Sequence, residues 1–146
     1  MRIAIGADHA GYLLKAVLAA RCAELGHQVD NHGTDTGDRV DYPDFGASVG
    51  RAVAAGDADL GVLVCGSGIG IAMAANKIPG IRAATVHDVT SARLCREHND
   101  ANVFCVGERF IGEQVALDAL DAFLAAEFEG GRHADRVAKI NALLPN

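Results

Sequence analysis

The sequence predicts a single α/β domain in which a five-stranded parallel sheet carries helices on both faces. Strand-like and helix-like segments alternate along its 146 residues, which is the pattern of consecutive β-α units joined by right-handed crossovers. One strand-like run, Leu60–Cys65 (LGVLVC), is apolar throughout, as expected of a central parallel strand covered on both faces. No fixed-period repeat, low-complexity tract or long linker divides the chain, so residues 1–146 are expected to form one domain.

The elements before the central strand follow in order. Arg2–Ala7 (RIAIGA) is a short β-rich run, and apolar residues then recur at helical spacing until Gly26 ends the helix. Gln28–His32 is the second strand. A turn-rich loop (TDTGDRVDYPD) leads to a helix that begins with Pro43 in its first turn and ends at about Ala55.

The elements after the central strand complete five β-α units. A glycine loop and a short helix end near Asn76. The next elements are a strand Ile81–Val86, a helix Thr90–Glu97, a strand Asn102–Val106 and a helix Gly112–Ala126. An extra C-terminal helix, Arg132–Leu144, has no strand partner and is free to dock on another subunit.

Composition excludes several classes of function. A formal charge of -6 opposes nucleic-acid binding, which sums many Lys and Arg contacts, although one small phosphate needs only two or three cationic groups. No apolar run approaches the ~20 residues that span a bilayer, and the start lacks the order of a signal peptide. We therefore expect a cytoplasmic protein that binds neither nucleic acid nor membrane. Its four cysteines form no C-x-x-C pair and are expected to be free thiols.

The most informative segment follows the central strand and reads Cys65-Gly66-Ser67-Gly68-Ile69-Gly70. Ligands of parallel α/β sheets bind beyond the carboxyl ends of the strands, and glycines there let backbone N–H groups converge on an anion. The loop lacks the Gly-Lys-Ser/Thr of a nucleotide P-loop, and Ile71 stands where a dinucleotide fingerprint needs its third glycine. The segment therefore predicts an anion site of another kind.

Cys65 is the candidate base. A thiol at a helix N-terminus ionises more readily than a free cysteine, whereas many cysteines are only small buried hydrophobes, as expected of Cys22. The Ser67 hydroxyl and the glycine cradle favour catalysis, because enolisation requires a base beside an oxyanion site.

Three further polar groups have both a functional and a structural interpretation. Asp8 and His9 follow the first strand, where Asp8 could instead cap a helix. His98 falls in a polar segment that could simply end a helix. Arg132 and Arg136 are four residues apart, so on one helix they could share a phosphate or form a solvated basic face.

The residues also favour proton transfer over hydride transfer for a reaction that proceeds by enolisation. A hydride shift needs a metal cage of carboxylates and histidines, and none is visible; the acidic loop Asp35–Asp44 fits no calcium loop and reads as a solvated turn. Proton transfer through a cis-enediolate, with no metal and no cofactor, is therefore expected.

Seven ordered motifs along essentially the whole chain resemble the B-type ribose-5-phosphate isomerases and the related galactose-6-phosphate isomerase subunits. The motifs are Gly6-Ala7-Asp8-His9-Ala10-Gly11, Asp41-Tyr42-Pro43, the Cys65–Gly70 loop, Ala74-Ala75-Asn76-Lys77, Gly80-Ile81-Arg82, His98-Asn99 and Glu129-Gly130-Gly131-Arg132-His133-x-x-Arg136. The resemblance implies a three-layer α/β/α, flavodoxin-like (Rossmann-like) sheet, a homodimer with two sites at the subunit interface, and interconversion of ribose 5-phosphate and ribulose 5-phosphate.

The resemblance also implies the role of each residue. Cys65 would move the proton between C1 and C2, and Ser67 with the amides of Gly66, Gly68, Ile69 and Gly70 would hold the enediolate oxygen. Ring opening and the sugar hydroxyls would fall to Asp8, Tyr42, His98 and Asn99, the last two reaching from the partner subunit. The phosphate would be held by His9, Arg109, Arg132 and Arg136.

Two departures and several alternatives accompany this resemblance. Ser67 replaces the threonine of many relatives, and a family variant with a catalytic glutamate in place of the cysteine would carry it where Ile71 stands. His98 is the preferred ring-opening residue, with His133 as its rival. Galactose 6-phosphate, allose 6-phosphate or a tetrose phosphate are alternative substrates. A non-catalytic module that binds a phosphorylated ligand would not need Cys65.

Overall fold

The computed structural model describes residues 1–144 and contains the five parallel strands that the sequence predicts. The strands are β1 (Arg2–Ala7), β2 (Gln28–Asn31), β3 (Leu60–Cys65), β4 (Ala83–Thr85) and β5 (Val103–Gly107). The helices are α1 (Tyr12–Glu24), α2 (Tyr42–Ala54), α3 (Ile69–Ala75), α4 (Val89–Asn99), α5 (Glu113–Ala125) and α6 (Ala134–Ala142), with a 3₁₀ turn η1 (Gly131–His133) before α6. The α/β class is confirmed.

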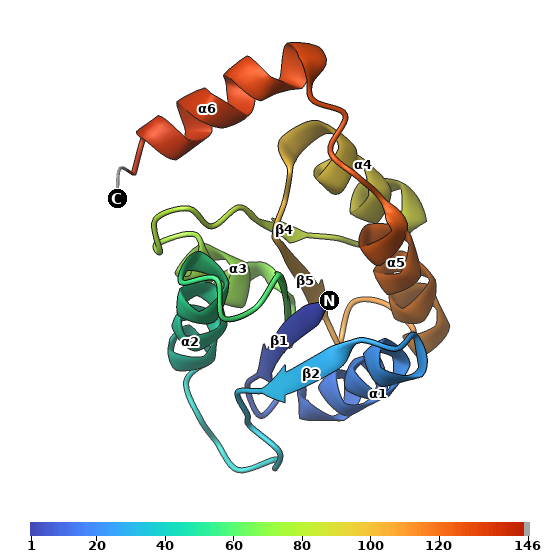
Figure 1. Cartoon of the computed structure of the whole chain (residues 1–146). Helices are drawn as coiled ribbons and strands as arrows, with labels where there is room; N and C mark the ends of the chain where they lie inside the picture. The colour runs from blue at the N-terminus through green and yellow to red at the C-terminus, as the bar shows by residue number, and fades with distance from the viewer. Residues whose placement is uncertain (145–146) are drawn as a thin grey trace.

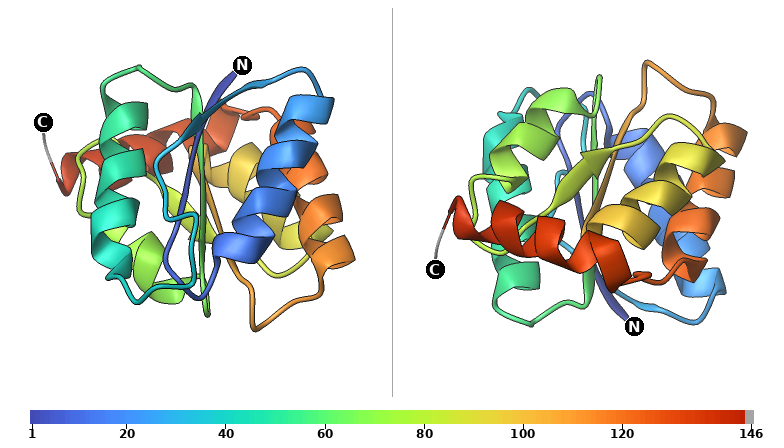
Figure 2. Two further views of the ribbon diagram at one scale, coloured as in Figure 1. Left: turned by 90° about the horizontal axis from the view of Figure 1, so that it is seen from below. Right: turned by 90° about the horizontal axis from the view of Figure 1, so that it is seen from above.

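The sheet lies between two helical layers, as Figure 2 shows with the sheet seen edge-on. Along β3, alternate side chains enter different cores: Val62 and Val64 pack with α1 and α5, whereas Leu63 and Cys65 pack with α2 and α3. The alternation follows from the two-residue period of a strand. The predicted three-layer α/β/α architecture is therefore confirmed, and Cys65 belongs to the α2–α3 face.

The strand order is β2-β1-β3-β5-β4. A flavodoxin-like sheet has the order 2-1-3-4-5, so the expected architecture is present but its last two strands are exchanged. Burial explains the exchange. All five residues of β5 are buried, which suits a place beside β3, whereas β4 has three half-buried residues and forms the edge.

Several boundaries differ from the prediction by one or two residues, and two of these differences affect how the chain runs near the candidate site. The strand expected over Ile81–Val86 is only Ala83–Thr85, because Asn76 pairs its amide with the Ala83 backbone and begins the pairing late. The C-terminal helix begins at Ala134, after a turn in which Gly130 and Gly131 have positive φ. Arg132 and His133 therefore precede α6 instead of lying on it.

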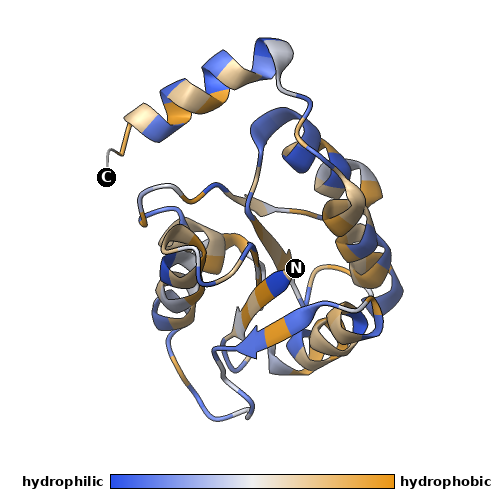
Figure 3. Ribbon diagram, in the orientation of Figure 1, coloured by the Kyte–Doolittle hydropathy of each residue, from blue (hydrophilic) through white to orange (hydrophobic). Residues whose placement is uncertain are grey.

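Helix α6 stands apart from the two helical layers (Figure 1). It alternates hydrophilic and hydrophobic residues along its length (Figure 3). Val137 is its buried residue, and Asn141 accepts a hydrogen bond from Arg82 at 3.1 Å, while Ile140 and Leu143 are exposed. The helix thus covers the sheet only partly. Within residues 1–144, no helix has both the length and the apolar character needed to cross a membrane.

Candidate active site

A cavity of about 560 Å³ opens at the carboxyl ends of β1, β3 and β5. The chain passes from β2 to β3 across β1, so the crossover direction reverses between β1 and β3, where ligands of such sheets bind. The lining includes Asp8, His9, Tyr42, Cys65, Ser67 and Arg109. The strand-end argument from the sequence therefore predicted where this cavity lies.

Cys65 is the last residue of β3 and is 4% exposed. The backbone N–H of Gly68 donates a hydrogen bond to its Sγ at 3.1 Å. Gly68 makes this approach with φ of +77°, and a side chain there would meet the Val106 backbone at 2.7 Å. The amide points its positive end at the sulfur, which stabilises negative charge on it.

The other three cysteines pack in the hydrophobic core or against it. Burial raises the pKa of Cys22 and of Cys95 to about 11, and burial together with the neighbouring Cys65 raises the pKa of Cys105 well above its usual range. All three are neutral near pH 7. The interpretation of Cys22 as a core residue is confirmed, since its side chain is fully buried.

The glycine loop is held tightly between α2 and β5. Ser67 accepts a hydrogen bond from the Ile69 N–H at 3.2 Å. A Cβ on Gly70 would lie 2.7 Å from the Tyr42 ring, and one on Gly107 would lie 2.5 Å from the Ser67 backbone. The loop keeps its shape because these two glycines leave no room for another arrangement.

The remaining residues at this edge surround the loop. Asp8 is buried and accepts a hydrogen bond from the Ala10 N–H at 2.9 Å; it does not cap α1, whose N-cap is Gly11. Nδ1 of His9 lies 3.1 Å from the Val40 carbonyl oxygen. A Cβ on Gly66 would lie 3.5 Å from Nη1 of Arg109, so this guanidinium covers the start of the loop.

The other predicted site residues lie at the opposite end of the strands. We call the end of the sheet where the strands terminate, and where the cavity lies, the carboxyl edge, and the end where they begin the amino edge. Cys65 pairs with Gly107 at the carboxyl end of β5, whereas Gly61 pairs with Val103 at its amino end. Four residues of strand span about 13 Å. His98 ends α4, which leads into the amino end of β5, so the chain does not bring His98 to its own Cys65.

At this amino edge, His98 and His133 stack with ring centroids 4.3 Å apart and planes 9° apart. Oε2 of Glu129 lies 4.0 Å from Nε2 of His98 and 3.7 Å from Nε2 of His133. Burial, and after it His98 and Arg132, lowers the pKa of His133, so its imidazole is uncharged near pH 7. Arg136 acts on His133 in the same direction.

The structure gathers the predicted site residues into two groups, one at each end of the strands, and brings Glu129, which was not predicted as a site residue, to the second group. Asn99, Arg132 and Arg136 accompany His98, but the contact of Glu129 with both histidines was not anticipated. The spacing of Glu129 and His133, four residues apart, was the available signal. Stacking of His98 on His133 joins segments 35 residues apart, which local patterns do not reveal.

The carboxyl-edge cavity, which has a buried thiol beside a glycine loop, is that of an α/β enzyme. The profile of the Ribose/Galactose Isomerase family matches residues 3–140, and the chain belongs to this family. The family resemblance noted in the sequence is confirmed, and with it the expectation of an isomerase.

Among curated relatives, the chain is 46% identical to ribose-5-phosphate isomerase B of Escherichia coli, over 97% of this chain and 95% of the relative. It is 42% identical to the D-erythrulose-4-phosphate isomerase of Pectobacterium atrosepticum, over 96% and 93%. It is also 40% identical to a galactose-6-phosphate isomerase subunit of Clostridium acetobutylicum, over 100% and 85%.

Solved structures agree with this assignment. The ribose-5-phosphate isomerase B of Clostridium thermocellum superposes with a TM-score of 0.97 at 51% identity, covering 98% of this chain and 97% of that one. The enzyme of Mycoplasma genitalium, with bound ribulose-5-phosphate, superposes with a TM-score of 0.93 at 40% identity, covering 97% and 95%.

Proposed function

We propose that residues 1–146 act as one isomerase domain that interconverts ribose 5-phosphate and ribulose 5-phosphate. The observation that carries the proposal is the position of Cys65 at the start of the glycine loop, where its Sγ accepts a hydrogen bond from the Gly68 N–H. Family membership supports it, as do the relatives named ribose-5-phosphate isomerase B and the related structure with bound ribulose-5-phosphate.

In the proton-transfer step, the Cys65 thiolate takes the C2 proton of the open-chain aldose, and the C–H electrons form the C1–C2 double bond of a cis-enediolate. The negative charge then rests on O1, where the Ser67 hydroxyl and the Gly66 and Gly70 amides of the glycine loop would donate hydrogen bonds, since the Gly68 and Ile69 amides already donate to Cys65 and Ser67. The Cys65 thiol returns its proton to C1, and the O2 hydroxyl proton passes to O1. The thiolate is thereby regenerated, and no net proton is consumed.

The other roles are divided between the two edges. At the carboxyl edge, where all four residues line the cavity, Asp8 and Tyr42 would contact sugar hydroxyls, and His9 and Arg109 would contact the phosphate. From the amino edge, His98 and Asn99 would assist ring opening, with Arg132 and Arg136 on the phosphate.

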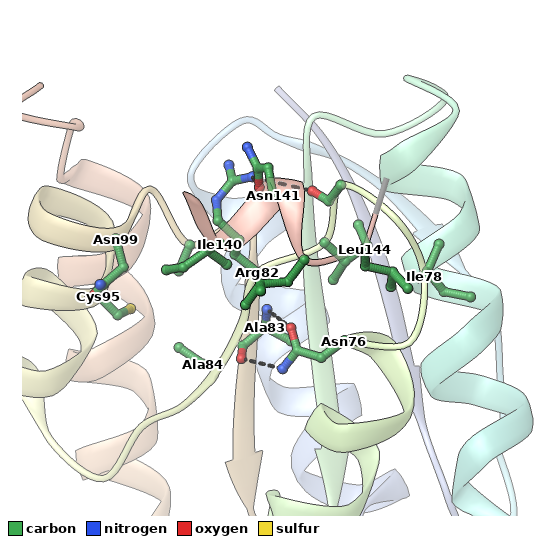
Figure 4. A pocket seen from close by; sticks show the side chains of 14 residues that line it. Asn76, Ile78, Arg82, Ala83, Ala84, Cys95, Asn99, Ile140, Asn141 and Leu144 are labelled. Atoms are coloured by element: carbon green, nitrogen blue, oxygen red, sulfur yellow. Dashed lines mark hydrogen bonds between the residues drawn. The ribbon is translucent and has the colours of Figure 1, made fainter. Parts of the chain in front are cut away.

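These roles require a homodimer in which the amino edge of one chain meets the carboxyl edge of the other. Two observations support it. The two groups of residues lie at opposite edges of the same sheet. An apolar cavity of about 450 Å³ also lies between α6 and β4, with Asn99 on its rim and Ile140 and Ile78 in its lining (Figure 4). Burying such a surface against a partner is favourable.

A second substrate is favoured by a specific observation, the D-erythrulose-4-phosphate isomerase at 42% identity. The deciding experiment compares kcat/KM for ribose 5-phosphate with the values for erythrulose 4-phosphate, allose 6-phosphate and galactose 6-phosphate. We expect ribose 5-phosphate to give the highest value. A higher value for another sugar phosphate would transfer the proposal to that substrate. If the protein exchanged neither the C2 hydrogen of the aldose phosphates nor a C1 hydrogen of erythrulose 4-phosphate with solvent, it would be a binding module and not an isomerase.

We also propose that the protein works in the cytoplasm. The four cysteines are free and none pairs in a disulfide within the described residues 1–144, which suits a reducing compartment. Cell fractionation with an antibody to the native protein tests this, and recovery in the medium or envelope fraction would contradict it.

A further inference from the structure

One cluster of metal-binding side chains lies at the amino edge of the sheet. His98 belongs to the last turn of α4, Glu129 to the segment after α5, and His133 to η1. The Glu129 N–H donates a hydrogen bond to the Glu97 carbonyl at 3.0 Å, which fixes this segment beside the end of α4. In the part of the chain from residue 1 to 144, this is the one group of three His, Cys, Asp or Glu donors that gathers closely, within 4.8 Å.

The distances between these side chains are too long for hydrogen bonds between them and are closer to those of ligands that share one metal ion. The Glu129 oxygen lies 3.7 Å from Nε2 of His133 and 4.0 Å from Nε2 of His98, beyond hydrogen-bond length. Donor atoms around a tetrahedral Zn²⁺ ion are about 3.3 Å apart. The group therefore needs to contract by less than about 1 Å between the carboxylate and each imidazole to reach that spacing.

One adjustment of ring orientation is required. The two imidazoles are nearly parallel, at 9°, so their in-plane lone pairs do not converge on one point. The His98 side chain is 34% exposed and can turn its edge toward a shared ion, while the buried His133 stays in place. The Glu129 carboxylate is exposed and can also move toward the shared ion.

The donor set selects the ion. Two imidazoles and one carboxylate are a familiar Zn²⁺ ligand set, with water as a fourth ligand, whereas Mg²⁺ and Ca²⁺ require mostly oxygen ligands. Arg132 and Arg136 face His133 and repel a cation, so binding at this site should be reversible.

We propose that His98, Glu129 and His133 form a Zn²⁺ site, and that its occupation inhibits the isomerase. The inhibitory part rests on the proposed function, in which the imidazole of His98 assists ring opening; the nitrogen of this ring that lies near Glu129 is Nε2. Zn²⁺ at this site occupies that nitrogen and draws His98 away from its stacked position. The ion therefore opposes catalysis and takes no part in the proton transfer.

The test titrates Zn²⁺ alone into the whole chain by calorimetry, without substrate, so its outcome does not depend on which sugar phosphate is isomerised. We expect one ion per chain. Glu129→Gln should weaken binding by at least about 10-fold and relieve zinc inhibition to the same extent. Glu127→Gln, an exposed glutamate of the same segment, is the matched control and should bind as the wild type does.

Cys65 is the competing zinc ligand, because thiolates bind Zn²⁺ well. The Cys65→Ala chain should therefore keep its zinc site, and Co²⁺ in the wild-type chain should show no thiolate-to-metal charge-transfer band. Loss of binding in Cys65→Ala, or wild-type affinity in Glu129→Gln, would overturn the proposal. If the chain binds zinc through Glu129 but does not isomerise ribose 5-phosphate, the zinc site is supported and only the proposed substrate is wrong.

Discussion

The carboxyl edge and the amino edge of the sheet are built in different ways. At the carboxyl edge, the backbone makes the site: Cys65 is buried, and the glycines that surround it pack against Tyr42 and β5 too closely to allow a side chain. At the amino edge, side chains make it: two stacked imidazoles and a carboxylate meet on short, largely exposed segments. The first region needs no other chain to hold its shape, whereas the second would gain its role in the proposed homodimer, where it faces another chain.

The largest effect is expected at the carboxyl edge. Cys65→Ala should fold normally, because it removes only a sulfur, yet lose about 10²–10⁴-fold in isomerase rate and in exchange of the C2 hydrogen with solvent. The exchange is followed by NMR in deuterated buffer. Cys22→Ala, a core position on α1 that lines neither the carboxyl-edge cavity nor the apolar cavity beside α6, is the control. Near-normal exchange by the Cys65 variant would remove this residue as the base.

A smaller loss is expected when the phosphate contact at the amino edge is removed. Arg136→Ala should lower kcat/KM for ribose 5-phosphate by about 10–100-fold, the value of a lost charged hydrogen bond, and lower it little for ribose. Added guanidinium should restore part of the activity.

Lys139→Ala, on the same helix, should leave both values unchanged. An equal fractional loss on ribose and ribose 5-phosphate in Arg136→Ala would mean that this residue supports the fold or the dimer.

The rigidity of the carboxyl edge can be tested through Gly107. An alanine there would place Cβ 2.5 Å from the Ser67 backbone, so the loop must move, at a cost of about 1–3 kcal/mol in the free energy of unfolding. Urea unfolding measures the cost, and kcat should fall with it. Gly112→Ala meets no atom within 4 Å and serves as the control. Unchanged stability and kcat in Gly107→Ala would show that the loop is adaptable.

The smallest effect concerns the dependence of stability on pH at the amino edge. Burial, His98, Arg132 and Arg136 lower the pKa of His133, against an opposing effect of Glu129. The unfolded chain therefore binds a proton at this residue more readily, and stability should fall as pH drops below about 6.5 and level off below the folded pKa. Urea unfolding of His133→Gln should give a flatter curve over that range. An identical slope in both chains would contradict this account.

Much of the carboxyl edge follows from local sequence. The apolar run Leu60–Cys65 predicts a strand covered on both faces, and the glycines after it predict the loop. The sequence therefore predicted where the cavity lies and that Cys65 lines it. The order of the strands in the sheet could not be predicted from the sequence. The exchange of β4 and β5 depends on which strand buries more surface, a property of the assembled sheet.

The amino edge was predicted only as separate motifs. Its members come from α4 and from the segment around η1, and their meeting depends on the path of the chain after α5. The placement of Arg132 on a long helix was wrong, since the two positive-φ glycines before it impose a turn. The helical spacing of Arg132 and Arg136 gives no sign of such a turn.

The most direct test of the account mixes two inactive chains. Cys65→Ala lacks the base at the carboxyl edge, and His98→Ala lacks the imidazole at the amino edge. After unfolding and refolding together, one dimer in two should be mixed and contain one site with both residues intact. The account predicts that activity returns to about a quarter of the wild-type value per chain, whereas each variant refolded alone stays inactive. Mixed dimers that form, as native mass spectrometry can verify, and remain inactive would contradict the claim that the two edges meet across the interface.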